Sequence, residues 1–277
     1  MRVLDRLRLA LLMVVSAPVK PGTVHRLRLD PDYEVRLAEV TVVSRYLDEA
    51  YERGRMLAAG RVDARSLGLG RLFSQAVRDV FEFTEEKPLA GLAFAALGAS
   101  VVVGYSSETG REVADEFKRL ARLLVYGTGS EDTLAFLDGL EAIGYADALL
   151  ELDKAGISRR LISLEDLPLG EVLEKIQSVD TGFAFNLRGY NTLLVAWRRA
   201  RQSKSLVELV LRAFYELGVD SGIIPEARGN SISSHLASLD KRLEKGSTDK
   251  LLGGTAWIAL MENAFRGLPP VPGLPRR

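Results

Sequence analysis

The sequence predicts an all-α protein that folds as a single compact domain of about ten helices joined by short loops. Nearly every segment repeats its apolar residues with a period of about 3.6 positions, as an amphipathic helix does. No convincing series of alternating apolar and polar residues indicates a significant sheet. Hydrophobic residues make up 47% of the 277 positions and charged residues 27%. This composition is ordinary for a globular protein with a substantial core, and it excludes disorder over most of the length.

Four segments carry the clearest helical stripes, and residues that typically begin or end helices flank them. The expected segments, with their flanking residues, are 109–127 (Thr109 and Gly127), 130–144 (Ser130 and Gly144), 206–218 (Gly218 at the end) and 247–260 (Ser247 or Thr248 at the start).

Two apolar runs raise the question of export or membrane insertion. Residues 9–17 resemble the core of a signal peptide, but the run is short and Asp5 lies in the region that should be positive. We therefore expect a mature amphipathic helix there. The run 89–103 contains Gly91 and Gly98 and falls short of the roughly 20 residues that a membrane span requires. A buried helix is the better interpretation, and we expect a soluble, cytoplasmic protein with no membrane partner.

Small residues suggest that helices in the centre approach one another closely. Gly91, Ala95 and Gly98 fall on one side of the segment 89–103, and Gly253 and Gly254 lie in the last expected helix. Glycine lets a neighbouring backbone or a ligand come near, and core packing is the more frequent cause.

Charge and residue usage exclude several classes of function. Thirty-seven basic residues balance thirty-seven acidic ones, so no global field favours nucleic acid as a partner. The chain has no cysteine and only two histidines, which excludes disulfides, thiolate nucleophiles and a multi-histidine zinc site. A local basic pocket for a small anion remains open, as does a homodimer.

The chain is expected to form one helical domain over residues 1–266. Residues 267–277 contain four prolines and should form an extended tail. An inert end is the simplest interpretation of this tail, with docking as the alternative.

The first stretch with chemical potential is residues 16–26, which read SAPVKPGTVHR. Pro21 and Gly22 are expected to stop the first helix and turn the chain. Lys20, His25 and Arg26 follow one another closely, and such a turn can present an ammonium and a guanidinium to phosphate oxygens. The alternative is a solvated basic turn between two helices.

The second stretch is residues 219–229, which read VDSGIIPEARG. Asp220 is expected just after a helix stop, where a carboxylate can hold a cation or accept a proton. Arg228 stands beside Gly229, so a phosphate could approach it with little steric hindrance. The alternative is an ordinary turn, in which Asp220 and Ser221 bond their own backbone.

The stretch 16–26 resembles a motif of the triphosphoribosyl-dephospho-CoA synthase family, especially of its archaeal-type members. That motif reads Ser-Ala-x-Pro-Lys-Pro-Gly-x-Val-His-Arg and is followed by an Asp-rich stretch. The second stretch is similar to the family's Asp-Ser/Thr-x-Ile segment with Arg and Gly shortly after it. A third stretch, residues 244–252, is similar to a helix start that reads Asn-Pro-Gly-x-Thr-Ala-Asp-Leu-Leu. The matching residues of the first stretch are Ser16, Ala17, Lys20, Pro21, Gly22, Val24, His25 and Arg26, followed by Asp30 and Asp32.

The chain also departs from the family pattern at several positions. Val14 stands where the family has a glutamate, and residues 84–91 replace a central Asn-Thr-x-x-Gly motif. In the third stretch Lys250 takes the place of the family's Asp, with Asp249 displaced by one. The resemblance covers most of the chain in helix order, but only the first motif is nearly intact.

The resemblance implies a transferase that moves the 5-triphosphoribosyl group of ATP to a hydroxyl of dephospho-CoA or a similar acceptor and releases adenine. It implies Mg²⁺ as cofactor, because a triphosphate must be neutralised. Ser247 and Thr248, at a helix start, suit an anion or plain capping. The roles that follow are Lys20, Arg26 and Arg228 as phosphate partners, Asp220 as metal ligand or general base, His25 as proton donor or polar contact, and Asp30 and Asp32 as second-choice metal ligands.

Two rival hypotheses remain open at the level of sequence. One is a helical protein that keeps the nucleotide pocket without catalysis. The other is an interaction scaffold with no pocket, in which Lys20, His25, Asp220 and Arg228 lie far apart and exposed. The ligand-based hypotheses instead expect Lys20, Arg26, Asp220 and Arg228 to share one cleft.

Overall fold

The computed structural model describes residues 2–27, 31–183, 189–227 and 231–270, and these form an all-helical protein without strands. The predicted fold class is therefore confirmed, with more and shorter helices than expected. The α-helices are α1 (Val3–Ser16), α2 (Pro31–Ser44), α3 (Leu47–Ala58), α4 (Leu69–Thr84), α5 (Ala90–Thr109), α6 (Val113–Tyr126), α7 (Ser130–Ala142), α8 (Ala146–Lys154), α9 (Arg159–Glu165), α10 (Leu169–Ile176), α11 (Gly189–Ala200), α12 (Leu206–Asp220), α13 (Ile232–Leu239) and α14 (Leu252–Arg266). Two 3-10 helices are η1 (Thr181–Phe183) and η2 (Asp249–Leu251).

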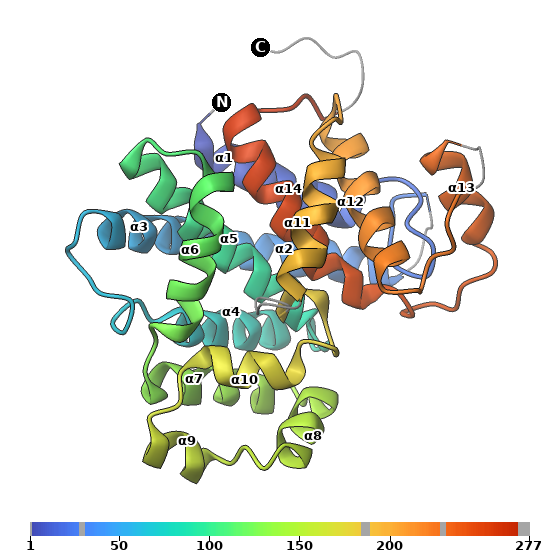
Figure 1. The fold of residues 1–277 in the computed structure, drawn as a ribbon. Helices are drawn as coiled ribbons and strands as arrows, with labels where there is room; N and C mark the ends of the chain where they lie inside the picture. The colour runs from blue at the N-terminus through green and yellow to red at the C-terminus, as the bar shows by residue number, and fades with distance from the viewer. Residues whose placement is uncertain (1, 28–30, 184–188, 228–230, 271–277) are drawn as a thin grey trace.

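Helix α5 lies in the centre of the molecule, with α3, α4, α6 and α14 packed around it (Figure 1). It is apolar on all sides, as expected for a helix surrounded by protein. It is also long and apolar enough to cross a membrane by length and composition, but 89% of its apolar window is buried inside the protein. The prediction of a buried helix over 89–103 is confirmed.

Glycines allow α5 to touch α3 backbone to backbone. A Cβ atom at Gly54 of α3 would lie 2.0 Å from the carbonyl oxygen of Val101, and one at Gly104 of α5 would lie 2.0 Å from that of Tyr51. No side chain fits at either position. The expected close approach of central helices is thus present, and it extends to α3 and α5, a pair that was not predicted to touch.

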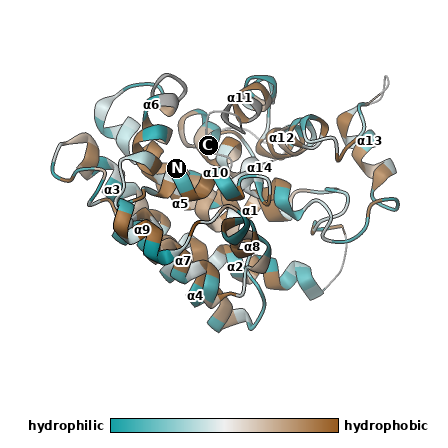
Figure 2. Cartoon of the chain, turned by 60° about the horizontal axis from the view of Figure 1, so that its bottom comes forward, coloured by the Kyte–Doolittle hydropathy of each residue, from teal (hydrophilic) through white to brown (hydrophobic). Residues whose placement is uncertain are grey.

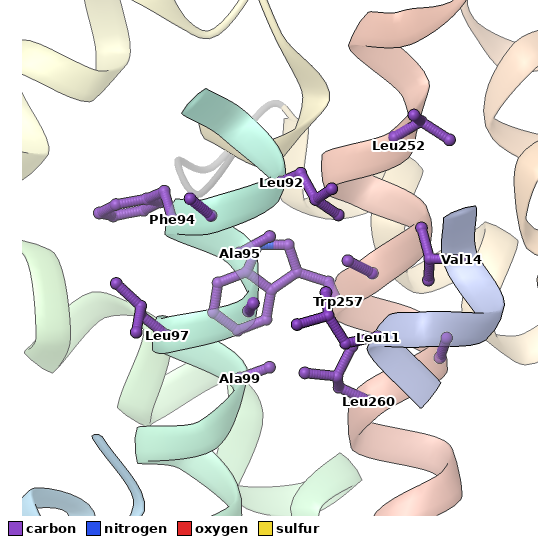
Figure 3. Close-up of a cluster of buried hydrophobic side chains, with 14 of the residues drawn as sticks. Leu11, Val14, Leu92, Phe94, Ala95, Leu97, Ala99, Leu252, Trp257 and Leu260 are labelled. Carbon is purple, nitrogen blue, oxygen red and sulfur yellow. The ribbon is translucent and has the colours of Figure 1, made fainter. Parts of the chain in front are cut away.

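The contact between α5 and α14 is built around the indole ring of Trp257 (Figure 3). A Cβ atom at Gly98 would lie 2.4 Å from this ring, so the glycine predicted to pack closely makes room for the largest side chain of the core. Leu11 and Val14 of α1 lie beside the same cluster. Val14, where the family that the sequence resembles has a glutamate, is therefore a core residue.

Outer helices are amphipathic, and hydrophilic and hydrophobic stretches alternate along them (Figure 2). Helices α7 to α10 form one end of the molecule, beneath α4 in Figure 1. An aromatic cluster joins this end to the centre: the rings of Phe73 and Phe136 lie 4.6 Å apart, and Phe94 and Phe183 contact Phe136 edge-on at 5.6 and 5.7 Å.

Several helix boundaries differ from those predicted. Thr109 ends α5 and does not begin the next helix, because Gly110 adopts φ +68° and ends α5 there. The first helix ends at Ser16, before the turn that contains Pro21 and Gly22. Gly218 does not end α12, which continues to Asp220. A Cβ atom at Gly218 would lie 2.4 Å from Ile224, so this glycine serves packing.

The start of the predicted tail is docked on the helical body. The amides of Leu206 and Val207, at the start of α12, donate to the carbonyl oxygens of Pro269 and Pro270 at 2.8 and 3.2 Å. Leu268 is buried. Residues 271–277, which complete the predicted tail, lie outside the described part of the chain.

The substitution Gly104→Ala tests the α3–α5 contact. The added methyl group forces two backbones apart, so we expect the free energy of unfolding to fall by at least about 1 kcal/mol despite the better helix propensity of alanine. Chemical denaturation measures the change. The matched control is Ser107→Ala, at an exposed position of the same helix, which should stay within about 0.5 kcal/mol of the wild type. Equal stability of both variants would contradict the packing.

Candidate active site

The first and third sequence stretches meet in space although more than two hundred positions separate them. Gly22 adopts φ +74° and lies so near the segment 244–248 that a Cβ atom there would be 2.6 Å from Ser247 Oγ. Thr248 Oγ1 donates to the carbonyl oxygen of Pro21 at 2.7 Å, and the Thr23 hydroxyl donates to the Asp249 carboxylate. The turn after α1 and the start of η2 therefore form one wall.

Three helices begin beside this wall, and glycines bring them together. A Cβ atom at Gly182 of η1 would lie 2.1 Å from the carbonyl oxygen of Gly91, in the first turn of α5. A Cβ atom at Gly253 of α14 would lie 2.5 Å from the Cα atom of Gly182. The starts of α5, η1 and α14 thus touch through their backbones, which places Asp180 and Asp249 near one another at a common end of the core.

Two adjoining cavities open at this place, of about 290 and 360 Å³. Arg36, Gly246 and Asp249 line both, so we treat them as one site, the junction cleft. The first cavity is lined by Thr23, Val24, Asp32, Arg36, Lys245, Gly246 and Asp249, and the second by Arg36, Lys87, Pro88, Leu89, Tyr145, Asp147, Val179, Asp180, Gly246, Ser247, Asp249 and Lys250.

Two carboxyl groups of the junction cleft have altered proton affinities. Burial raises the pKa of Asp180 to about 7, although the amides of Gly182 and Gly91 donate hydrogen bonds to it. Burial likewise raises the pKa of Asp249, against the hydrogen bond from Thr23 and the positive charge of Arg36. Carboxyl groups whose pKa is raised inside a cleft are candidates for acid–base chemistry.

Lys20 does not present its ammonium to the junction cleft. The side chain is fully buried, and Nζ donates to the carbonyl oxygens of Val15 and Ala17 at 2.9 and 3.2 Å, closing the end of α1. Burial lowers the pKa of Lys20 to about 7, although Asp249 favours the charged form. A neutral amine has two N–H groups, which match the two carbonyl acceptors. In place of the expected phosphate contact, the structure shows a helix-closing contact behind the wall.

His25 and Arg26 also differ from their expected placement. The His25 ring is 2% exposed, and its Nε2 atom lies 3.1 Å from Asp240 Oδ1, so it ties the first stretch to the segment that follows α13. Arg26 is exposed. Neither residue lines the junction cleft, whereas Val24, directly before them, does.

The second sequence stretch lies elsewhere among the described residues. Asp220 is the exposed last residue of α12 and lines neither cavity; its charge acts on Arg199. Ala227 also lines neither cavity, and its amide donates a hydrogen bond to Tyr215 Oη at 2.8 Å. Arg228 lies outside the described residues, as does Asp30. The expected sharing of one cleft by Lys20, Arg26 and Asp220 is not observed.

Of the other predicted residues, Asp32, Ser247 and Thr248 belong to this region. Asp32 lines the first cavity and pairs with Lys245 at 2.6 Å. Ser247 lines the second cavity, and its hydroxyl donates to the carbonyl oxygen of Glu244 at 2.6 Å. Thr248 is buried and caps no helix with its side chain, because its hydroxyl is bonded to Pro21.

Sequence reasoning missed several residues of the cleft. Arg36 and Lys87 were not singled out, because an isolated charge on an amphipathic helix or in a loop gives no signal. Tyr145 and Asp180 lie in connecting segments. For Asp249 the only indication in the sequence was its position, one residue before Lys250, which aligns with the aspartate of the similar family motif.

Comparisons of the chain with protein families, with curated proteins and with solved structures find no match. Within the described ranges, no three histidine, aspartate or glutamate side chains gather closely enough to hold a metal ion by themselves.

The buried amine of Lys20 predicts a pH dependence of stability. Its pKa is about 7 in the folded protein and near 10.4 when unfolded, so the unfolded state binds more protons between these values. Stability from this group must then rise as pH increases from 7. We expect the wild type to gain roughly 2 kcal/mol more than Lys20→Met between pH 7 and 9, measured by chemical denaturation. Parallel stability–pH profiles of the wild type and Lys20→Met would refute the burial of the amine. The control is Lys175→Met, at an exposed position, whose profile should match that of the wild type.

Proposed function

We propose that the chain is a nucleotide-dependent transferase of the triphosphoribosyl-dephospho-CoA synthase type, with the junction cleft as its active site. One observation supports this proposal above the others. The two stretches that carry the family resemblance at the ends of the chain meet at this cleft, through Thr23 and Asp249 and through Pro21 and Thr248. We also propose that the protein works in the cytoplasm on small molecules.

The charges of the cleft suit a metal–polyphosphate. Its lining side chains include four cations, Arg36, Lys87, Lys245 and Lys250, and four carboxylates, Asp32, Asp147, Asp180 and Asp249. Guanidinium and ammonium groups bind phosphate oxygens, whereas carboxylates bind the cation that accompanies them.

Mg²⁺ fits the donor set of the first cavity, which offers hard oxygen atoms from Asp32 and Thr23. These residues would supply only part of its shell, with the phosphates and water supplying the remainder, which is usual for this ion. When bound, the ion neutralises the triphosphate.

The proposed reaction is substitution at the ribose C1 atom of ATP. The acceptor hydroxyl oxygen forms the new bond to C1, the bond from C1 to the adenine nitrogen breaks, and adenine leaves with that electron pair. Asp249 takes the proton of the hydroxyl, since burial raises its pKa above that of a solvated carboxylate. Asp180, with a pKa of about 7, donates a proton to the departing adenine. This assignment moves the base from Asp220 to Asp249.

A binding protein without turnover is the second candidate, and specific observations favour it. His25, the predicted proton donor, is bonded to Asp240, and residues 84–91 lack the family's central motif. The scaffold hypothesis expects Lys20, His25 and Asp220 to be far apart and exposed. Asp220 is exposed and lines neither cavity, but Lys20 and His25 are buried and two cavities are present.

Release of free adenine tests the transferase. Incubation with ATP, Mg²⁺ and dephospho-CoA should yield adenine, and Asp249→Asn should lower the rate by about 10²- to 10⁴-fold, because the base is lost. Chromatography of the products measures both. Asp153→Asn, at an exposed position on α8, is the control and should keep the wild-type rate. No adenine at high enzyme concentration would end the transferase proposal.

Protection against thermal unfolding separates the transferase from the binding protein. A ligand at 100 times its Kd stabilises the folded state by about 2.7 kcal/mol, so ATP with Mg²⁺ should raise the melting temperature measurably. Protection without adenine release selects the binding protein. If ATP neither protects nor reacts, both ligand-based functions fail.

A further inference from the structure

Glu39 is a fully buried carboxylate, at a position where desolvation of its charge is unfavourable. It lies on α2, its side chain is 0% exposed, and burial raises its pKa against the opposing effect of Arg36. Groups of this kind are retained in a fold only where their partners are well aligned. The partners of Glu39 therefore indicate its purpose.

Both carboxylate oxygens are engaged at short range. Oε2 accepts a hydrogen bond from Arg36 Nη1 at 2.7 Å, and Oε1 accepts one from the amide of Leu89 at 2.7 Å. Arg36 Nη1 also donates to the carbonyl oxygen of Lys87 at 2.9 Å. Glu39 thus clamps Arg36 onto the segment that leads into α5.

This clamp holds Arg36 at the boundary between the two cavities. Arg36 lines both of them, together with Gly246 and Asp249. Its two hydrogen bonds use Nη1, and in the described part of the chain none uses Nε or Nη2. A guanidinium held through Nη1 can still present Nε and Nη2 together to an oxyanion. Because the side chain is already ordered in the folded protein, binding loses less conformational entropy.

We propose that Glu39 is a positioning residue, which fixes Arg36 as the anchor for the anionic end of a polyphosphate at the junction of the two cavities. The inference rests on the proposed function and names the residue pair that gives the site its anion affinity. Stability alone does not require the pair, because apolar residues of similar volume often replace a buried ion pair without loss.

Binding of inorganic tripolyphosphate with Mg²⁺, measured by isothermal titration calorimetry, tests this proposal. Glu39→Gln places an amide N–H₂ against the guanidinium or breaks the bond to Leu89, so we expect affinity to fall at least tenfold. Arg36→Met should weaken binding by a similar or larger factor. The double variant should bind no worse than Arg36→Met alone, because Glu39 acts only through Arg36.

Two further variants separate positioning from general damage. Glu34→Gln, at an exposed position of the same helix, should keep wild-type affinity. Arg36→Lys keeps the charge and loses the fork, so it should weaken binding while leaving Glu39 paired, even if Glu39→Gln does not fold. Wild-type affinity in Arg36→Lys, additive losses in the double variant, or no binding of tripolyphosphate by the wild type would overturn the proposal.

The outcome is distinguishable from that of the adenine assay. If tripolyphosphate binding depends on Arg36 and Glu39 but no adenine is released, the proposal of an anion anchor stands and the transferase proposal fails. Adenine release that is indifferent to both residues retains the transferase and removes the anchor.

Discussion

The candidate site depends on one packing constraint, the meeting of three helix starts at Gly91, Gly182 and Gly253. Side chains at these positions would collide with neighbouring backbone or with Asp180. Because these three positions carry no side chain, α5, η1 and α14 begin almost in contact, and the loops that precede them surround the junction cleft. Tight packing of the central helices and the existence of a polar cleft at their end are therefore consequences of the same small residues.

Buried ionisable groups gather around this opening although burial of each one is unfavourable. Lys20 lies behind the wall, Glu39 lies behind Arg36, and Asp180 lies at the start of η1. A purely structural core would gain stability from apolar residues at most of these positions. Several shifted pKa values in one place are typical of sites that bind or transform charged molecules. The charges also compensate one another, which explains how the fold tolerates them before a ligand binds.

The sequence predicted the architecture better than the site. Helical periodicity and the small residues of α5 were sufficient for the all-α class and for a buried central helix, because both depend on local pattern. Asp220 was expected beyond a helix stop, but Gly218 packs against Ile224 and lets α12 continue. Arg36 could not have been found, because its place depends on the long-range bond to Lys87, and no periodicity encodes that contact.

The family resemblance did not identify which stretches meet. The first stretch was expected to share a cleft with residues 219–229, whereas in the structure it contacts residues 244–252. The resemblance also did not indicate that the cations of the first stretch would face inward. A motif records which residues occur together, whereas the direction of each side chain is set by the helix end on which it lies.

Hydrogen exchange of the backbone amides, with and without ATP and Mg²⁺, tests the central claim most directly. Ligand in the junction cleft should slow exchange in three separate segments at once, residues 22–25, 86–91 and 245–251. Residues 219–227 should exchange at an unchanged rate. Slowing confined to residues 219–227 would contradict the account and place the ligand at the end of α12. No slowing anywhere would mean that the protein does not bind ATP.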